Sequence, residues 1–285
     1  LNVIESVPVH EDIKMGRGRR DALIENYKET IRNLAKAGIG TVCYNFMPVF
    51  DWPRIELDAP LPDGSNSLKY DEALVKDIDP LSGELTLPGW DLSYQTDDLK
   101  EIIDAYQDIS EDQLFDNLIY FLERIIPVAE AEDVLMAIHP DDPPWGIFGL
   151  PRIITGAPAL RKLFDAVPSR HNGITFCTGS YGSTPDNDLF EIIELAKERI
   201  HFVHARNVKW TGERSFQETS HSVHDGSLDM VGIVEKLIES GVDVPIRPDH
   251  GRMIWGETGR PGYGLYDRAL GAAYLNGIID TVNRK

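Results

Sequence analysis

Six short runs of apolar and β-branched residues, separated by segments with helical spacing, restrict the fold of this chain more than any other feature. The runs are NVIESVPV (2–9), TVCYNFMPV (41–49), VLMAIHP (134–140), ITFCTGS (174–180), HFVHARNV (201–208) and VPIRPDH (244–250). Amphipathic helical spacing is found at 20–38, 186–200, 229–241 and 266–280. Strand-like runs that alternate with helical segments predict a parallel β-sheet joined by crossover helices.

Each of these runs ends in polar or reactive residues. They are Glu5 and Ser6, Asn45, His139, Cys177, His204 with Arg206, and Asp249 with His250. In a parallel barrel the carboxyl ends of all strands meet at one mouth, where active sites form. An open doubly wound sheet is the alternative, but it would gather such residues at a single switch point. The distribution over nearly every strand therefore favours an α/β fold of the (β/α)8 TIM-barrel type.

The length of the chain suits one large domain. It has 285 residues, 42% of them hydrophobic, which is enough for a sizeable core. Six predicted units are two fewer than a closed barrel needs, and the sequence begins at Leu1 without a methionine, so we expect about two N-terminal βα units to be missing. The segment 51–110, rich in Asp, Pro and Gly, is too long for an ordinary connection. We expect it to be an inserted lid or interface excursion within a single catalytic domain, 1–285.

Charge and hydropathy exclude several classes of partner. The chain carries 28 basic and 47 acidic residues, a formal net charge of −19, which disfavours nucleic acid and anionic membranes as partners. No apolar run reaches the roughly 18 residues that a membrane span needs, and the first residues lack a signal-peptide pattern. A cytoplasmic location is therefore expected. Cys43 and Cys177 are the only cysteines, too few for a disulfide framework.

Four side chains able to bind a metal stand at the ends of four different runs: His139, Cys177, His204 and Asp249. A lone histidine at a strand end is usually a packed residue, and a lone cysteine is usually a small core hydrophobe. Four such residues at one barrel mouth predict a divalent metal site instead. Imidazole, thiolate and carboxylate ligands suit zinc, iron(II) or manganese(II), so the spacing does not decide the metal.

Candidates for proton transfer and substrate binding surround these ligands. His250 follows Asp249 and can serve as acid or base near neutral pH, although packing under the following loop is the alternative. Tyr263, in the glycine-flanked loop 259–269, could reach the site or simply cap the barrel. Arg206 and Arg247 could clamp a substrate carboxylate, or pair with an acid of the barrel.

The polar segment 215–230 and two other positions complete the candidates. The segment holds His221, which could bind sugar hydroxyls, although such loops often only cap a helix, here the one beginning near Asp229. Asn45, at a strand end, is a further substrate-binding candidate. Asp141 and Asp142 follow His139 and are expected to make supporting hydrogen bonds or to cap their loop.

Several long stretches of the sequence resemble one enzyme family. They are VIESVPVHEDIKMG (3–16), VCYNFMPVFDW (42–52), IHPDDPPWGIFGLPRI (138–153), FCTGSYG (176–182), VHARNVK (203–209) and RPDHGRM (247–253). They closely resemble the mannonate dehydratase family, barrel enzymes related to the xylose-isomerase-like superfamily. The resemblance implies dehydration of D-mannonate to 2-keto-3-deoxy-D-gluconate, with Mn²⁺ or Fe²⁺, in hexuronate (glucuronate) catabolism.

Carried over position by position, the family's metal ligands fall on the same four residues. Its proposed acid and base fall on His250 and Tyr263. Our hypothesis favours His250 for protonating the departing hydroxyl, and it leaves open which residue is acid and which is base. A homodimer is also left open.

Two other functions are weighed against a dehydratase. A metal-dependent sugar isomerase or epimerase on the same barrel would use similar cations, but such sites are typically richer in Glu and Asp ligands. A non-catalytic metal-binding or assembly protein is the alternative from a different class.

Overall fold

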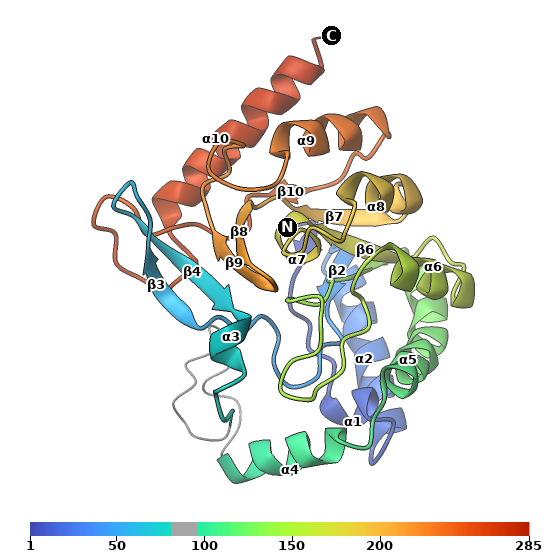
Figure 1. The fold of residues 1–285 in the computed structure, drawn as a ribbon. Coiled ribbons are helices and arrows are strands. Elements are labelled where there is room, and N and C mark those ends of the chain that lie inside the picture. Colours follow the sequence, from blue (N-terminus) through green and yellow to red (C-terminus); the bar gives the residue numbers. More distant parts are fainter. Residues whose placement is uncertain (81–95, 285) are drawn as a thin grey trace.

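A six-stranded parallel sheet forms the centre of the computed structural model, which describes residues 1–80 and 96–284 (Figure 1). In spatial order its strands are β1 (Val3–Ile4), β2 (Thr41–Tyr44), β5 (Leu135–Ile138), β6 (Asn172–Cys177), β7 (Ile200–His204) and β10 (Ile246–Arg247). All neighbouring pairs are parallel. All six predicted strand runs therefore contribute to this sheet, and the prediction of a parallel α/β fold is confirmed.

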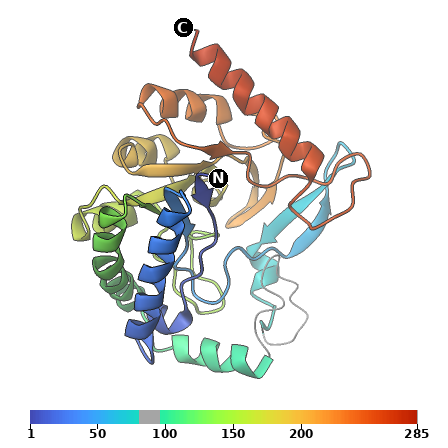
Figure 2. The ribbon, with the colours of Figure 1, turned by 180° about the vertical axis from the view of Figure 1, so that it is seen from behind.

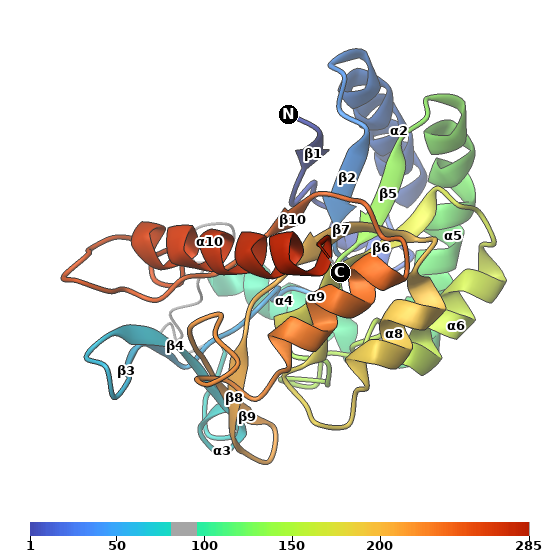
Figure 3. The ribbon, with the colours of Figure 1, turned by 90° about the horizontal axis from the view of Figure 1, so that it is seen from above.

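The parallel sheet is curled. Seen from above, its strands follow an arc with helices on the outer side (Figure 3). Within the described residues β1 and β10 stand at the two ends of the strand order, so these six strands form a half-barrel. The two additional N-terminal units expected from the sequence stay a prediction.

Six helices cover the outer side of the half-barrel (Figures 1 and 2). They are α2 (Arg20–Lys36), α5 (Glu111–Ala131), α6 (Ala157–Ala166), α8 (Leu189–Ala196), α9 (Met230–Glu239) and α10 (Leu265–Val282). The four predicted helical segments correspond to α2, α8, α9 and α10. Asp229 caps α9, since its side chain accepts a hydrogen bond from the backbone nitrogen of Gly232 at 3.0 Å.

Aromatic packing fixes the helical layer against the sheet. Phe121 of α5 is fully buried. Its ring centroid lies 5.0 Å from that of Tyr27 on α2 and 6.1 Å from that of Tyr44 on β2. These edge-on contacts tie two helices to the strand that leads to Asn45, and so hold one wall of the strand-end region in place.

A second, antiparallel sheet stands beside the first. Its strands are β3 (Glu56–Pro60), β4 (Asn66–Asp71), β9 (Ser215–Glu218) and β8 (Val208–Gly212), in that spatial order. Segments far apart in the sequence thus form one layer (Figure 1). The expected excursion at 51–110 supplies half of this sheet, and the run predicted as one strand at 201–208 is divided between β7 and β8.

The rest of the expected excursion contains two helices. They are α3 (Glu72–Val75) and α4 (Thr96–Tyr106), while residues 81–95 lie outside the described residues. A role as lid or interface stays a prediction. Two further short helices, α1 (Glu11–Lys14) and α7 (Thr178–Tyr181), follow β1 and β6. No helix in the described part of the chain combines the length and apolar character of a membrane span.

Candidate metal centre and active site

The carboxyl ends of the parallel strands meet around one cavity. Its volume is about 280 Å³, near the lower end of the roughly 300–1,000 Å³ typical of small-molecule sites. The lining residues are Glu5, Ser6, Cys43, Tyr44, Asn45, Met47, Asp51, Trp52, His139, Asp142, His204, Arg206, Arg247, Asp249, His250 and Tyr263. The cavity is therefore a small, strongly polar chamber at the mouth of the half-barrel.

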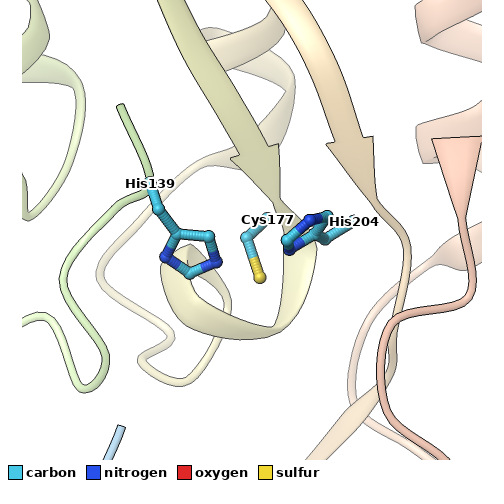
Figure 4. A group of neighbouring side chains, drawn as sticks. All are labelled: His139, Cys177 and His204. Atoms are coloured by element: carbon cyan, nitrogen blue, oxygen red, sulfur yellow. The ribbon is translucent and has the colours of Figure 1, made fainter. Parts of the chain in front are cut away.

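The four predicted metal ligands come together at this mouth. His139, Cys177 and His204 stand at the ends of β5, β6 and β7, and their ligand atoms all lie within 4.8 Å of one another (Figure 4). Asp249 reaches the same point from β10. One of its oxygens lies 3.8 Å from the sulfur of Cys177, and the other lies 3.6 Å from Nδ1 of His204.

The chemistry of this donor set fits a divalent cation. Both ring nitrogens of His204 are buried, with Nε2 3.1 Å from Oε1 of Glu5 and Nδ1 3.6 Å from Oδ1 of Asp249. Nδ1 of His139 lies 2.7 Å from the carbonyl oxygen of Pro140. It can only donate there, so Nε2 keeps its lone pair free for a cation. Two imidazoles beside a thiol and a carboxylate offer the nitrogen, sulfur and oxygen donors that a divalent cation binds.

Asp249 has the charge that a ligand needs. Burial would raise the pKa of its carboxyl, but the neighbouring His250, His204 and Arg247 lower it well below the usual range. Nε of Arg206 lies 2.9 Å from Oδ2 of Asp249. The carboxylate is therefore ionised and firmly held.

Glu5 gives a second possible grouping around His204. Its Oε1 lies 3.1 Å from Nε2 of His204, and the ligand atoms of Glu5, Cys43 and His204 also lie within 4.8 Å of one another. Burial, however, raises the pKa of the Cys43 thiol well above its ordinary value. Asp249 lies 3.8 Å from the sulfur of Cys177 and adds a carboxylate donor to the set with His139 and His204, so that set is the better metal site.

His250 and Tyr263 both line the cavity. Nδ1 of His250 lies 2.8 Å from each carboxylate oxygen of Glu218. The rings of His250, Trp52 and Tyr263 form a cluster, with centroid distances of 4.7 Å from His250 to Trp52, 5.8 Å from His250 to Tyr263 and 6.1 Å from Trp52 to Tyr263. The predicted acid and base are thus neighbours on one wall, with Trp52 packed against His250.

The loop that carries Tyr263 is held by its backbone. Gly251 and Tyr263 form a parallel bridge, and the backbone nitrogen of Gly264 donates to the carbonyl oxygen of Gly251 at 3.1 Å. A Cβ atom at Gly264 would lie 1.8 Å from the carbonyl oxygen of Arg252, so the approach requires glycine. Tyr263 is therefore delivered to the cavity by a tethered segment.

The predicted substrate-binding residues fall into two groups. Asn45 and Arg247 line the cavity, and Arg247 remains partly exposed while it contacts Glu5 and Asp249. Arg206 also lines the cavity, but its nitrogens are engaged by protein carboxylates. His221 is not brought to the cavity, because its Nε2 lies 2.7 Å from the carbonyl oxygen of Pro248 and its ring is buried.

Comparison with known proteins agrees with this arrangement. The family model described as D-mannonate dehydratase (UxuA) matches residues 1–285. The chain belongs to the mannonate dehydratase family. Two relatives are 58% identical: the mannonate dehydratase of Streptococcus agalactiae, over 99% of this chain and 82% of the relative, and mannonate dehydratase 2 of Halalkalibacterium halodurans, over 99% and 83%.

Solved structures extend the comparison. The crystal structure of mannonate dehydratase from Streptococcus suis serotype 2 matches with a TM-score of 0.92 and 51% identity, over 100% of this chain and 78% of that one. A xylose isomerase-like TIM-barrel protein from Mycobacterium smegmatis matches with a TM-score of 0.57 and 11% identity, over 99% of this chain and 73% of that one. The distant match supports the barrel type of fold and nothing more.

A buried charge network adjoins the cavity of this mannonate dehydratase family member, and Asp142 and Arg206 belong to both. Nη1 and Nη2 of Arg54 each lie 3.0 Å from an oxygen of Asp142, and Nη2 also lies 3.0 Å from Oε1 of Glu218. Arg206 contacts the same two carboxylates, with Nη1 2.6 Å from Oε1 of Glu218 and Nη2 bonded to Asp142. Sequence reasoning missed Arg54 and Glu218, since nothing in their local sequences marks them.

The network holds its carboxylates ionised. Burial alone would raise the pKa of Glu218, but the charges of His250, Arg206 and Arg54 lower it to about 2. Burial is likewise outweighed at Asp142, where Arg54 and Arg206 lower the pKa below its ordinary value. Both folded-state values lie below those of an unfolded chain, so the native state binds fewer protons in acid.

The pKa of Glu218 predicts a measurable effect on acid stability. Its contribution is fully present above the unfolded value of about 4.3 and is lost as the pH falls toward the folded value. In Glu218→Gln this proton uptake is absent. We expect the free energy of unfolding in urea to fall less steeply between about pH 5 and pH 3 than in wild type, by up to about 1.4 kcal/mol per pH unit. The prediction would be contradicted if the free energy of unfolding had the same dependence on pH in Glu218→Gln as in wild type.

Proposed function

We propose that this protein is a metal-dependent hydro-lyase that converts D-mannonate to 2-keto-3-deoxy-D-gluconate in glucuronate catabolism. One observation carries the proposal: His139, Cys177, His204 and Asp249 assemble at the mouth of the half-barrel, in a chain that belongs to the mannonate dehydratase family. The names of the close relatives support the choice of substrate.

We assign Mn²⁺ or Fe²⁺ to these four residues. A divalent cation bound there would supply Lewis-acid stabilisation of the negative charge that develops next to the substrate carboxylate. The mixed nitrogen, sulfur and oxygen donors suit both ions.

Arg247 is our candidate for holding the carboxylate of the substrate. It ends β10 and lines the cavity, and its side chain keeps 32% of its surface exposed. Its Nη1 and Nη2 contact Glu5 and Asp249, which hold the guanidinium at the cavity. Arg206, in contrast, has only 3% of its side chain exposed and contacts three protein carboxylates, so we assign it to holding Asp249. A guanidinium on the cavity wall would attract the substrate carboxylate locally, although the chain as a whole has a net negative charge.

Dehydration needs two proton transfers, and we assign them to His250 and Tyr263. One of the pair accepts the C2 proton and the other protonates the C3 hydroxyl, which leaves as water. A C2=C3 double bond forms, and the enol tautomerises to the 2-keto acid. Both side chains line the cavity, and their ring centroids lie 5.8 Å apart, so they can act on neighbouring carbons of one small substrate.

The test is an assay of the purified protein. With Mn²⁺ or Fe²⁺ and D-mannonate we expect a 2-keto-3-deoxy acid, detected as a product that reacts with periodate and thiobarbiturate, and we expect none after chelation of the metal. Neutral aldoses and ketoses serve as the comparison panel. Isomerisation or epimerisation of a neutral sugar without turnover of D-mannonate would favour the alternative function. A homodimer stays a prediction.

A further inference from the structure

Glu218 contacts His250 and is not itself among the residues that line the cavity. It ends β9 in the antiparallel sheet, whereas His250 follows β10 of the parallel sheet. Both carboxylate oxygens lie 2.8 Å from Nδ1 of His250, and the two residues are only 4% and 8% exposed. A buried, ionised carboxylate can only accept at this distance, so the proton of the imidazole belongs on Nδ1.

We propose that Glu218 is a positioning residue for His250, fixing the tautomer that carries its proton on Nδ1 and presents Nε2 for proton transfer. This inference rests on the proposed function, in which His250 exchanges a proton with the substrate. Nothing in the local sequence around Glu218 indicates this role.

The aromatic neighbours of His250 do not explain its orientation alone. Trp52 and Tyr263 limit the tilt of the imidazole, at centroid distances of 4.7 Å and 5.8 Å. These tilted ring contacts, however, hardly distinguish the present orientation of the imidazole from one turned by half a turn, in which the two ring nitrogens would exchange sides. The hydrogen bond to Glu218 distinguishes between these edges, so it selects the nitrogen that faces the reaction.

Glu218 is itself rigidly held. Nε and Nη2 of Arg54 lie 3.2 Å and 3.0 Å from its Oε1, and Nη1 of Arg206 lies 2.6 Å from the same atom. Its backbone is paired in register with Val208 of β8. The antiparallel sheet therefore supplies a fixed acceptor to the active site, in addition to covering it.

A purely structural role for Glu218 is the competing explanation. Glu218 could serve only to neutralise Arg54 and Arg206, as Asp142 does. Asp142 contacts the same two guanidinium groups and is also buried. Its side-chain partners among the described residues are Arg54, Arg206 and Ser180, and His250 is not one of them. The substitution Asp142→Asn therefore reports the cost of disturbing the charge network without removing the acceptor of His250.

The decisive experiment is a double-mutant cycle of Glu218→Gln and His250→Asn in the metal-loaded protein. Glutamine keeps the volume of glutamate but does not impose one tautomer, since its amide can donate or accept. We expect Glu218→Gln to lower kcat about 10–100-fold, the range typical of supporting residues, with KM and metal content nearly unchanged. In the double variant we expect the kcat of His250→Asn alone. The proposal would be overturned if the fold-loss of kcat in the double variant equalled the product of the losses in the two single variants. An unchanged kcat in Glu218→Gln would overturn it as well.

A second readout does not depend on turnover. In Zn²⁺-loaded protein with ¹⁵N-labelled histidine, the imidazole signals that disappear in His250→Asn belong to this residue. We expect them to show an Nδ1–H tautomer in wild type and in Asp142→Asn, and a mixture or the other tautomer in Glu218→Gln. An Nε2–H tautomer in wild type refutes the positioning role, even if Glu218→Gln fails to fold. Because this measurement needs no D-mannonate, it separates failure of the inference from failure of the proposed function.

Discussion

Replacing His139 with alanine is expected to remove the bound divalent cation and, with it, the dehydration of D-mannonate. The imidazole of His139 supplies one of the nitrogen donors of the candidate metal site, within 4.8 Å of the ligand atoms of Cys177 and His204. Loss of a direct ligand should weaken binding by more than the roughly 10–100-fold typical of residues that only support a ligand. The metal content of the dialysed protein is measured by elemental mass spectrometry. The value of kcat is measured with Mn²⁺ in excess.

His139 is well suited to this test because its removal should leave the fold intact. It is only partly buried, and its ring nitrogen contacts the carbonyl oxygen of the adjacent Pro140. His171→Ala is the matched control, since His171 precedes β6 at the end opposite Cys177 and its ring lies 3.4 Å from Asp133. The control should retain metal and activity. A full complement of cation in His139→Ala would refute the ligand assignment.

The grouping of the four candidate metal ligands could be predicted from sequence because the order and direction of parallel strands determine where their last residues lie. Once the six runs are recognised as parallel strands, their last residues must meet at one edge. The register bears this out, since Cys177 is paired with His204 and His204 with Arg247. Local patterns of apolar and polar residues were therefore sufficient to bring His139, Cys177, His204 and Asp249 together.

The contact between Arg54 and Glu218 beside the site could not be predicted in this way. Arg54 and Glu218 are separated by 164 residues and meet only because β4 pairs with β9 in a second sheet. Antiparallel pairing between two insertions leaves no short-range signal, and SFQE (215–218) resembles an ordinary polar segment. His221 shows the opposite error. Its loop chemistry suggested sugar binding, but the fold turns its ring toward the carbonyl oxygen of Pro248.

Replacing His250 with asparagine is expected to lower kcat by about 10²–10⁴-fold, the usual contribution of a general acid or base, while the metal stays bound. Asparagine can still donate to Glu218, so the buried carboxylate keeps a partner. It is also smaller than histidine, which leaves the cavity open. What it cannot do is exchange a proton near neutral pH. Steady-state kinetics with D-mannonate, together with metal analysis of the same preparation, measures both parts of the prediction.

The metal analysis decides between two explanations of a low kcat. His250 is adjacent to Asp249, and its Nε2 lies 4.0 Å from Oδ1 of that ligand, so a substitution could disturb the metal site indirectly. Loss of metal along with activity would mean that His250 acts through Asp249. Full metal content with a kcat within about tenfold of wild type would remove His250 from proton transfer, because the smallest usual contribution of such a group is about 10²-fold. His224→Asn, at an exposed histidine outside the cavity lining, should match wild type in both measurements.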